Sequence, residues 1–203
     1  MTPTDKTKLK NDRQIRALSV LLPNVEAKRI DSNYYVEGYA ARFEPYVLYE
    51  LDDGPIYEKF EPDCFRNCDM SDIIFQMNHQ GTVMARLSNG SLIVEPDERG
   101  LFVAADLGRT EAARRLYEEI STGMITKMSW GFFLGDCEYD TDTRTLVHHT
   151  VKKIFDVSAV SIPANQNTEI NARSWADGVI GEATRREVEL EERRRRLRLK
   201  LLI

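Results

Sequence analysis

Residues 126–134 read Thr-Lys-Met-Ser-Trp-Gly-Phe-Phe-Leu and weigh most in predicting the fold. Bulky apolar and aromatic side chains dominate this run, which is typical of a β-strand. Together with the residues that follow it, this run predicts a hairpin whose strands are residues 126–139 and 145–151. The polar run Asp140-Thr-Asp-Thr143 between them has the composition of a turn.

Further strand-like runs fill much of the chain on both sides of this hairpin. They are residues 13–22, 34–41, 71–77, 86–94, 101–107 and 155–162. Residues 44–61 contain Pro45, Gly54 and Pro55, so we expect a long loop there, followed by a short helix after Pro62.

The strongest helix signal is Thr110 to Thr122, where Ala112, Leu116 and Ile120 recur at four-residue spacing. Thr110 can cap its start and Gly123 suits a left-handed end. Many short strands with few helices predict a mainly β, α+β fold. The expected architecture is an antiparallel barrel, closed or nearly closed, with helices packed outside it.

Charge is spread unevenly along the 203 residues, whose net charge is -5. Residues 1–30 and 182–203 are both net basic, so the middle of the chain is strongly acidic. An acidic body argues against a nucleic-acid-binding protein. We expect a disordered basic tail over 1–12 and a folded domain over 13–170. We expect a linker and a charged, helical tail over 171–203, with linker-like composition over 164–181.

The class of protein is narrowed further by what the sequence lacks. Three cysteines without regular spacing do not suggest a disulfide framework, and a reducing cytoplasm is the simpler interpretation. Residues 1–10 lack the apolar segment of a secretory signal. No run reaches the ~18 apolar residues of a membrane span, so we expect no membrane partner.

Three residues could form a catalytic unit. His79 follows an apolar strand and precedes Gly81, Ser129 lies among bulky apolar residues, and Asp156 sits inside the apolar run Ile154–Val160. A serine hydroxyl needs an imidazole to take its proton, and a third group must orient that imidazole. A carboxylate buried in a strand also needs a partner, which His79 would supply. Each residue also has a non-catalytic interpretation: a loop histidine, an ordinary strand serine, and an aspartate paired with a neighbouring Lys or Arg.

Other chemistries stay open at this level. Lys127 and Ser129 share a strand face and could form a Ser–Lys dyad. Cys64 and Cys68 are four residues apart, although a zinc site usually needs a second such motif. A catalytically inactive structural or scaffold-binding head protein, gripping its partner with the basic ends, is the alternative outside enzymes.

Six blocks, in order, resemble the prohead protease family of tailed bacteriophages, over about Tyr35 to Ile170. The blocks are Val36–Ala40, Glu58–Phe65, Asn78-His79, Arg99–Val103, Gly123–Phe132 and Asp156–Asn165. The serine block, Gly123–Phe132, is the most specific. The chain departs from the family pattern at Asp63-Cys64, usually Gly-Ala, at Ala85-Arg86, and at Asp156, where Glu is common.

This resemblance implies a capsid-maturation serine endopeptidase with a barrel similar to that of herpesvirus assemblins. It implies His79, Ser129 and Asp156 as catalytic triad, with His148 or His149 as the runner-up for the third position, because assemblins use a second histidine there. The implied substrates are the capsid precursor with its scaffolding segment and the chain itself, as a homo-oligomer enclosed in the procapsid in the host cytoplasm. No cofactor or metal is implied.

Overall fold

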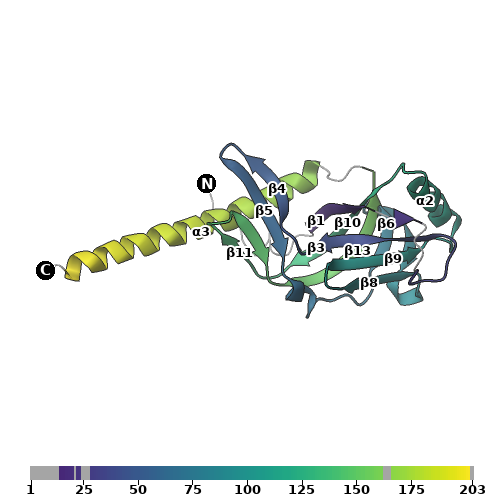
Figure 1. Ribbon diagram of the computed structural model, residues 1–203, viewed down its shortest axis with the longest axis horizontal. Coiled ribbons are helices and arrows are strands. Elements are labelled where there is room, and N and C mark those ends of the chain that lie inside the picture. The colour runs from purple at the N-terminus through teal and green to yellow at the C-terminus, as the bar shows by residue number, and fades with distance from the viewer. Residues whose placement is uncertain (1–13, 21, 24–27, 162–165, 202–203) are drawn as a thin grey trace.

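The computed structural model describes residues 14–20, 22–23, 28–161 and 166–201, so the expected disordered tail over 1–12 lies outside the described residues (Figure 1). Within them, thirteen strands form three sheets. The five-stranded sheet has the order β1 (Gln14–Val20), β10 (Lys127–Leu134), β13 (Val151–Val160), β6 (Ile74–Met77) and β7 (Gln80–Arg86).

Two four-stranded sheets complete the body. One has the order β11 (Cys137–Asp140), β12 (Thr145–His148), β5 (Gly54–Phe60) and β4 (Tyr46–Leu51). The other has the order β2 (Leu22–Pro23), β3 (Tyr35–Arg42), β9 (Gly100–Asp106) and β8 (Leu92–Pro96). The helices are α2 (Glu111–Ser121), α3 (Gln166–Leu201) and the short 3₁₀ turns η1 (Pro62–Phe65) and η2 (Leu87–Asn89). The mainly β, α+β class is therefore right.

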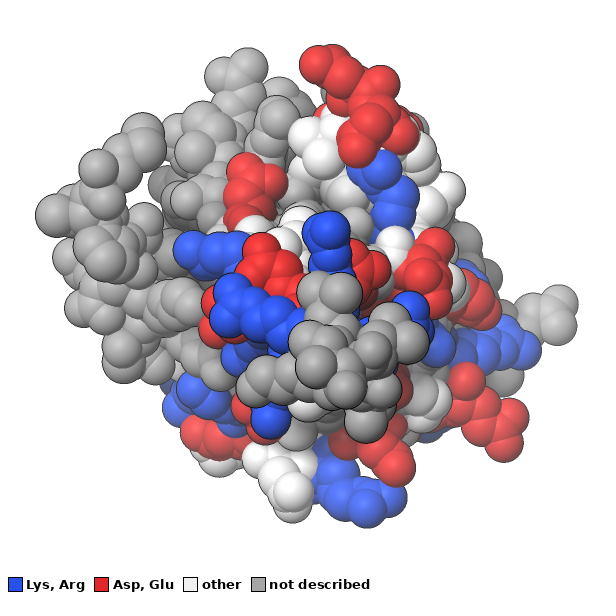
Figure 2. Space-filling view, turned by 90° about the vertical axis from the view of Figure 1, so that its left-hand side faces the viewer, with Lys and Arg blue, Asp and Glu red and all other residues white. Residues whose placement is uncertain are grey.

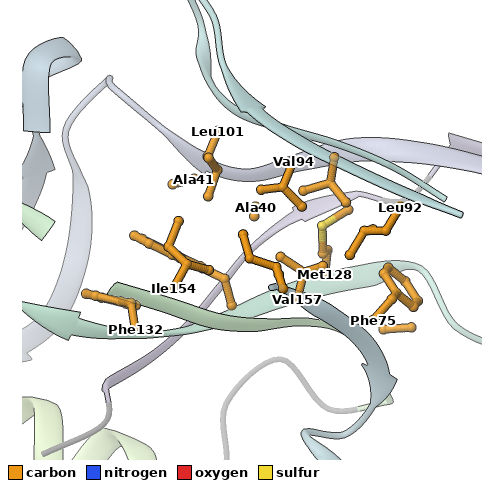
Figure 3. Packing of buried hydrophobic residues seen from close by; sticks show 14 of the residues in the cluster. Ala40, Ala41, Phe75, Leu92, Val94, Leu101, Met128, Phe132, Ile154 and Val157 are labelled. Atoms are coloured by element: carbon orange, nitrogen blue, oxygen red, sulfur yellow. The ribbon is translucent and has the colours of Figure 1, made fainter. Parts of the chain in front are cut away.

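The core lies between the sheets and is built by strand alternation. Along β10, Met128, Trp130 and Phe132 are fully buried, and the Trp130 and Phe132 rings stack with centroids 3.8 Å apart. Val157 of β13 and Phe75 of β6 join the same cluster (Figure 3). Because successive side chains of a strand point to opposite faces, filling this face with large apolar groups leaves Ser129 on the other one.

Helix α2 forms as its sequence predicts. The Thr110 hydroxyl accepts a hydrogen bond from Ala113 N at 3.1 Å, which caps the helix, and Gly123 has φ 77°, the left-handed value expected after its end. Leu116 and Ile120 are buried on one face. We attribute the helix to this amphipathic face together with its caps.

The structure corrects the expected barrel. Backbone pairing divides the described strands into three sheets, and no closed ring of strands is formed among them. Pairing is also not wholly antiparallel, because β12 runs parallel to β5 and β13 runs parallel to β6.

Two local expectations were also wrong. Residues 44–61 are not a long loop, because β4 and β5 form a hairpin there that tolerates Pro55 opposite Glu50. The hairpin around the Asp140 turn joins β11 to β12, whereas β10 pairs with β1 and β13. The linker expected over 164–181 is helical from Gln166, continuous with the charged segment. None of the helices in the described part of the chain is both long and apolar enough to span a bilayer.

Candidate active site

His79 occupies the tight turn between β6 and β7. Met77 pairs with Gln80, and the two residues between them, Asn78 and His79, have φ values of 51° and 59°. The type I′ turn of a two-residue hairpin requires this left-handed backbone at both positions, which costs a residue with a Cβ about 1 kcal/mol or more. Surrounding contacts must therefore hold the histidine in place.

Strand β13 supplies those contacts. Asn78 N donates to the Ala159 carbonyl at 2.9 Å, and the Asn78 side-chain oxygen accepts from Ser161 N at 3.1 Å. His79 N donates to Ser158 Oγ at 3.2 Å. The turn is thus fixed to the strand that carries Asp156.

Ser129 and Asp156 reach the same sheet face from neighbouring strands. In the register of β10 with β13, Ser129 lies opposite Ser158 and Gly131 opposite Asp156, so these side chains alternate away from the core. His79 bridges them: its Nε2 lies 2.7 Å from Ser129 Oγ and its Nδ1 lies 2.5 Å from Asp156 Oδ2. Three residues distant in the chain are thereby joined in one hydrogen-bonded row.

The row is nearly sealed from solvent. Ser129 and Asp156 are each 1% exposed, and the His79 side chain is 11% exposed. Ser129 Oγ also lies 2.8 Å from the backbone carbonyl oxygen of Arg16 in β1. A hydroxyl has one proton, so Ser129 donates either to this carbonyl or to His79 Nε2, and not to both at once.

Ser158 is a fourth member of the row that sequence reasoning missed. Its hydroxyl donates to Asp156 Oδ2 at 2.8 Å and accepts from His79 N, and the residue is fully buried. It therefore links the carboxylate to the strained turn. The only signal was its position two residues after Asp156, which places both on one face of a strand.

The other two histidines have glutamate partners. His148 is fully buried and its Nε2 lies 2.7 Å from Glu58 Oε1, while His149 Nδ1 lies 2.8 Å from Glu61 Oε2. The structure thus brings Asp156, and neither runner-up, to His79.

The His148 contact belongs to a buried ionic cluster, which consists of Arg16, Tyr46, Glu58 and His148. Arg16 donates to both oxygens of Glu58, at 2.6 Å from Nε and 2.8 Å from Nη2, and Tyr46 OH also binds this carboxylate. The Phe60 ring stacks on His148 with centroids 4.4 Å apart. Sequence reasoning missed this cluster, because Glu58 lies between Tyr57 and Lys59 in a run that reads as a solvated segment.

Electrostatics hold Arg16 and Glu58 of this cluster in their ionised forms. Burial acts to raise the pKa of Glu58, but the charges and hydrogen bonds of Arg16 and His148 outweigh it and place that pKa well below its usual value. Burial likewise acts to lower the pKa of Arg16, and Glu58 overrides it, so the guanidinium stays charged. The ion pair thus anchors β1, whose Arg16 carbonyl contacts the serine.

The alternative chemistries find no support in the described residues. Ser129 Oγ has His79 and the Arg16 carbonyl as partners, and Lys127 makes no described hydrogen bond to it. Burial raises the pKa of both Cys64 and Cys68 to about 12, which disfavours thiolate ligands. No group of three or more metal-ligating side chains occurs within the described ranges.

Comparison with known proteins identifies the family. The family model for the caudovirus prohead serine protease matches residues 23–178, most of the chain. No curated protein and no solved structure matches the chain. The matched region contains His79, Ser129 and Asp156. The chain belongs to the caudovirus prohead serine protease family and is a serine endopeptidase of phage capsid maturation.

Proposed function

We propose that Ser129, His79 and Asp156 are the nucleophile, general base and orienting carboxylate of this protease. The observation that carries the proposal is the pair of contacts made by one imidazole, 2.7 Å to Ser129 Oγ and 2.5 Å to Asp156 Oδ2. Asp156 accepts a hydrogen bond from the Nδ1–H group of His79, which leaves Nε2 free of a proton and able to take the serine proton. These are the roles that a serine hydroxyl requires to become a nucleophile at neutral pH.

The proposed reaction has two halves. Ser129 Oγ attacks the scissile carbonyl carbon while His79 Nε2 takes its proton, and His79 then gives that proton to the leaving amine as the C–N bond breaks. Water next attacks the acyl-enzyme with His79 again as base, releasing the acid and restoring Ser129. Ser158 positions Asp156 and the His79 backbone through both halves.

The contact between Ser129 and Arg16 must open before a peptide can be cut. Ser129 is 1% exposed, and its Oγ lies 2.8 Å from the carbonyl oxygen of Arg16. The Arg16 carbonyl therefore occupies the space beside Oγ that the scissile carbonyl of a substrate must enter. The buried Arg16–Glu58 ion pair holds the Arg16 carbonyl in position. We therefore expect low activity until local movement of β1, or binding of substrate, exposes the hydroxyl.

The family membership implies a capsid precursor as substrate and action inside the procapsid. We propose cleavage of its scaffolding segment, and cleavage of the chain itself in the segments flanking a protease domain of residues 13–170. The basic charge of both ends, against the acidic middle, supports treating them as separable from that domain.

The test is co-expression of the chain with its capsid precursor, followed by intact mass measurement of both proteins. We expect a shortened precursor and trimmed chain ends with the wild type, and full-length proteins with Ser129→Ala. Lys127→Ala is the matched control, because it removes the dyad candidate from the same strand and should leave cleavage intact. Cleavage by Ser129→Ala, or full-length masses in every case, would contradict the proposal.

A further inference from the structure

The outer half of α3 projects from the body without covering it (Figure 1). Thr141 Oγ1, in the turn between β11 and β12, donates a hydrogen bond to Glu187 Oε1 at 2.7 Å and ties α3 to the body at this point. Every residue over 188–198 is exposed, and this segment includes Val188, Leu190 and Leu197, each more than half exposed. Figure 2 shows acidic and basic side chains interspersed on the face from which the helix projects.

Apart from Arg193 and Arg194 at its centre, which are matched with each other, the charges of this segment are antisymmetric about its centre. Residues 187–200 read EVELEERRRRLRLK, and counting outward from the bond between Arg193 and Arg194, every acidic position is matched by a basic one. The matched positions with described side chains are Glu192 with Arg195, Glu191 with Arg196, Leu190 with Leu197, and Glu189 with Arg198. The apolar position is matched by another apolar one.

Stabilisation of a lone helix accounts for only part of this pattern. Acidic residues in the first half and basic residues in the second half interact favourably with the helix dipole. Glu192 and Arg196 also form an i,i+4 ion pair at 3.7 Å. Those effects do not require Leu190 and Leu197 to lie exposed seven residues apart, which places them on one side of the helix. Apolar side chains at seven-residue spacing are typical of a helix–helix seam.

We infer that α3 pairs antiparallel with α3 of a second copy of this chain, centred on the bond between Arg193 and Arg194. In that arrangement Leu190 of each copy meets Leu197 of the other. Each acidic segment over 189–192 lies beside the basic segment over 195–198 of the other copy, and like charges meet only at the central Arg193 and Arg194. A parallel pair would instead set Arg against Arg along the whole run from 193 to 196. This inference does not depend on the catalytic roles proposed above.

The first test measures molar mass by sedimentation equilibrium on the full chain, with Ser129→Ala to keep it whole and intact mass to verify its length. We expect a dimer. Reversing the basic half (R195E, R196E and R198E) or the acidic half (E189R, E191R and E192R) should weaken dimerisation at least about tenfold, because like charges then face each other. An equimolar mixture of the two reversed chains should dimerise again.

The second test fixes the direction of pairing with single cysteines, after Cys64, Cys68 and Cys137 are replaced by Ala. In an antiparallel pair, a mixture of Leu190→Cys and Leu197→Cys chains forms a mixed disulfide under mild oxidation. Leu190→Cys alone does not, because two copies of position 190 are about 10 Å apart along the helices, beyond the reach of a disulfide. Val188→Ala is the matched control, equally exposed but on the other side of the helix, and should leave the dimer unchanged.

Three results would overturn the inference. They are a monomeric Ser129→Ala chain, a dimer indifferent to both charge reversals, and self-linked Leu190→Cys chains, which indicate a parallel pair. A monomer that binds the scaffolding segment of the capsid precursor through residues 187–200 would show that the partner is that segment.

Discussion

Two histidine–carboxylate pairs lie near β1, and they have opposite surroundings. His79 and Asp156 are joined to a serine hydroxyl, at a turn where the imidazole keeps 11% of its surface exposed. His148 and Glu58 are joined to an arginine and are completely buried. The same chemical pair is therefore expected to serve catalysis in one place and stability in the other, and the neighbour of each pair decides which.

Arg16 connects the two pairs. Its side chain belongs to the buried ionic cluster, whereas its backbone carbonyl contacts Ser129. A change in the cluster is thus expected to reach the active site through one residue. Substitutions in each pair should therefore affect activity and stability to different extents.

The largest effect should follow from Asp156→Asn. The amide no longer holds His79 in the tautomer that leaves Nε2 as proton acceptor, so kcat should fall about 10⁴-fold, as in other serine triads. The measurement is steady-state cleavage of a precursor-derived peptide. The melting temperature should change little, and a loss of activity explained by unfolding would contradict the assignment.

Glu58→Gln should act on stability instead. Neutralising the carboxylate leaves the Arg16 charge buried without a counter-charge, which should lower the free energy of unfolding by about 3–5 kcal/mol. Denaturant titration measures it, with Glu61→Gln as control because that carboxylate is 42% exposed beside His149. Equal effects of the two substitutions would contradict the distinction between buried and exposed pairs.

The same cluster predicts a dependence of stability on acid. Because the folded protein depresses the pKa of Glu58, its contribution is present above the unfolded value near 4.5 and is lost as pH falls toward the folded value. The difference in unfolding free energy between wild type and Glu58→Gln should therefore shrink below about pH 4.5. A difference in unfolding free energy that stays constant, or that widens in acid, would contradict an ionised Glu58 in the folded protein.

Ser158→Ala should have the smallest effect, a loss of about tenfold in kcat with KM unchanged, because a hydrogen bond to a charged group contributes about 1.5–3 kcal/mol. Ser158→Thr keeps the hydroxyl and should recover part of the activity. If both variants lose the same activity, or if KM alone changes, Ser158 does not position the carboxylate.

Elements with local sequence signals were predicted from the sequence, and elements without them were not. The apolar runs around Ser129 and Asp156 predicted strands, and Thr110 with Gly123 predicted the bounds of α2, because these signals are local. The β4–β5 hairpin was hidden by Pro55, and β7 by its polar, exposed composition. Closure into a barrel could not be judged, since it depends on pairing between distant strands.

The candidate site likewise contains residues that the sequence predicted and residues that it did not. The block order and spacing were enough to name His79, Ser129 and Asp156, which the structure brings into contact. Arg16 and Glu58 are 42 residues apart and neither has a local signature of burial. Their partnership, and the Arg16 carbonyl beside Ser129, arise only when β1 lies along β10.

The most direct test of the central claim is covalent labelling of the full chain with a serine-directed fluorophosphonate, located by peptide mass mapping. We expect a single label on Ser129, and we expect its rate of formation to fall at least about 10³-fold in His79→Ala. Labelling of Ser129 at the same rate in His79→Ala, or labelling of another serine in its place, would contradict the central claim.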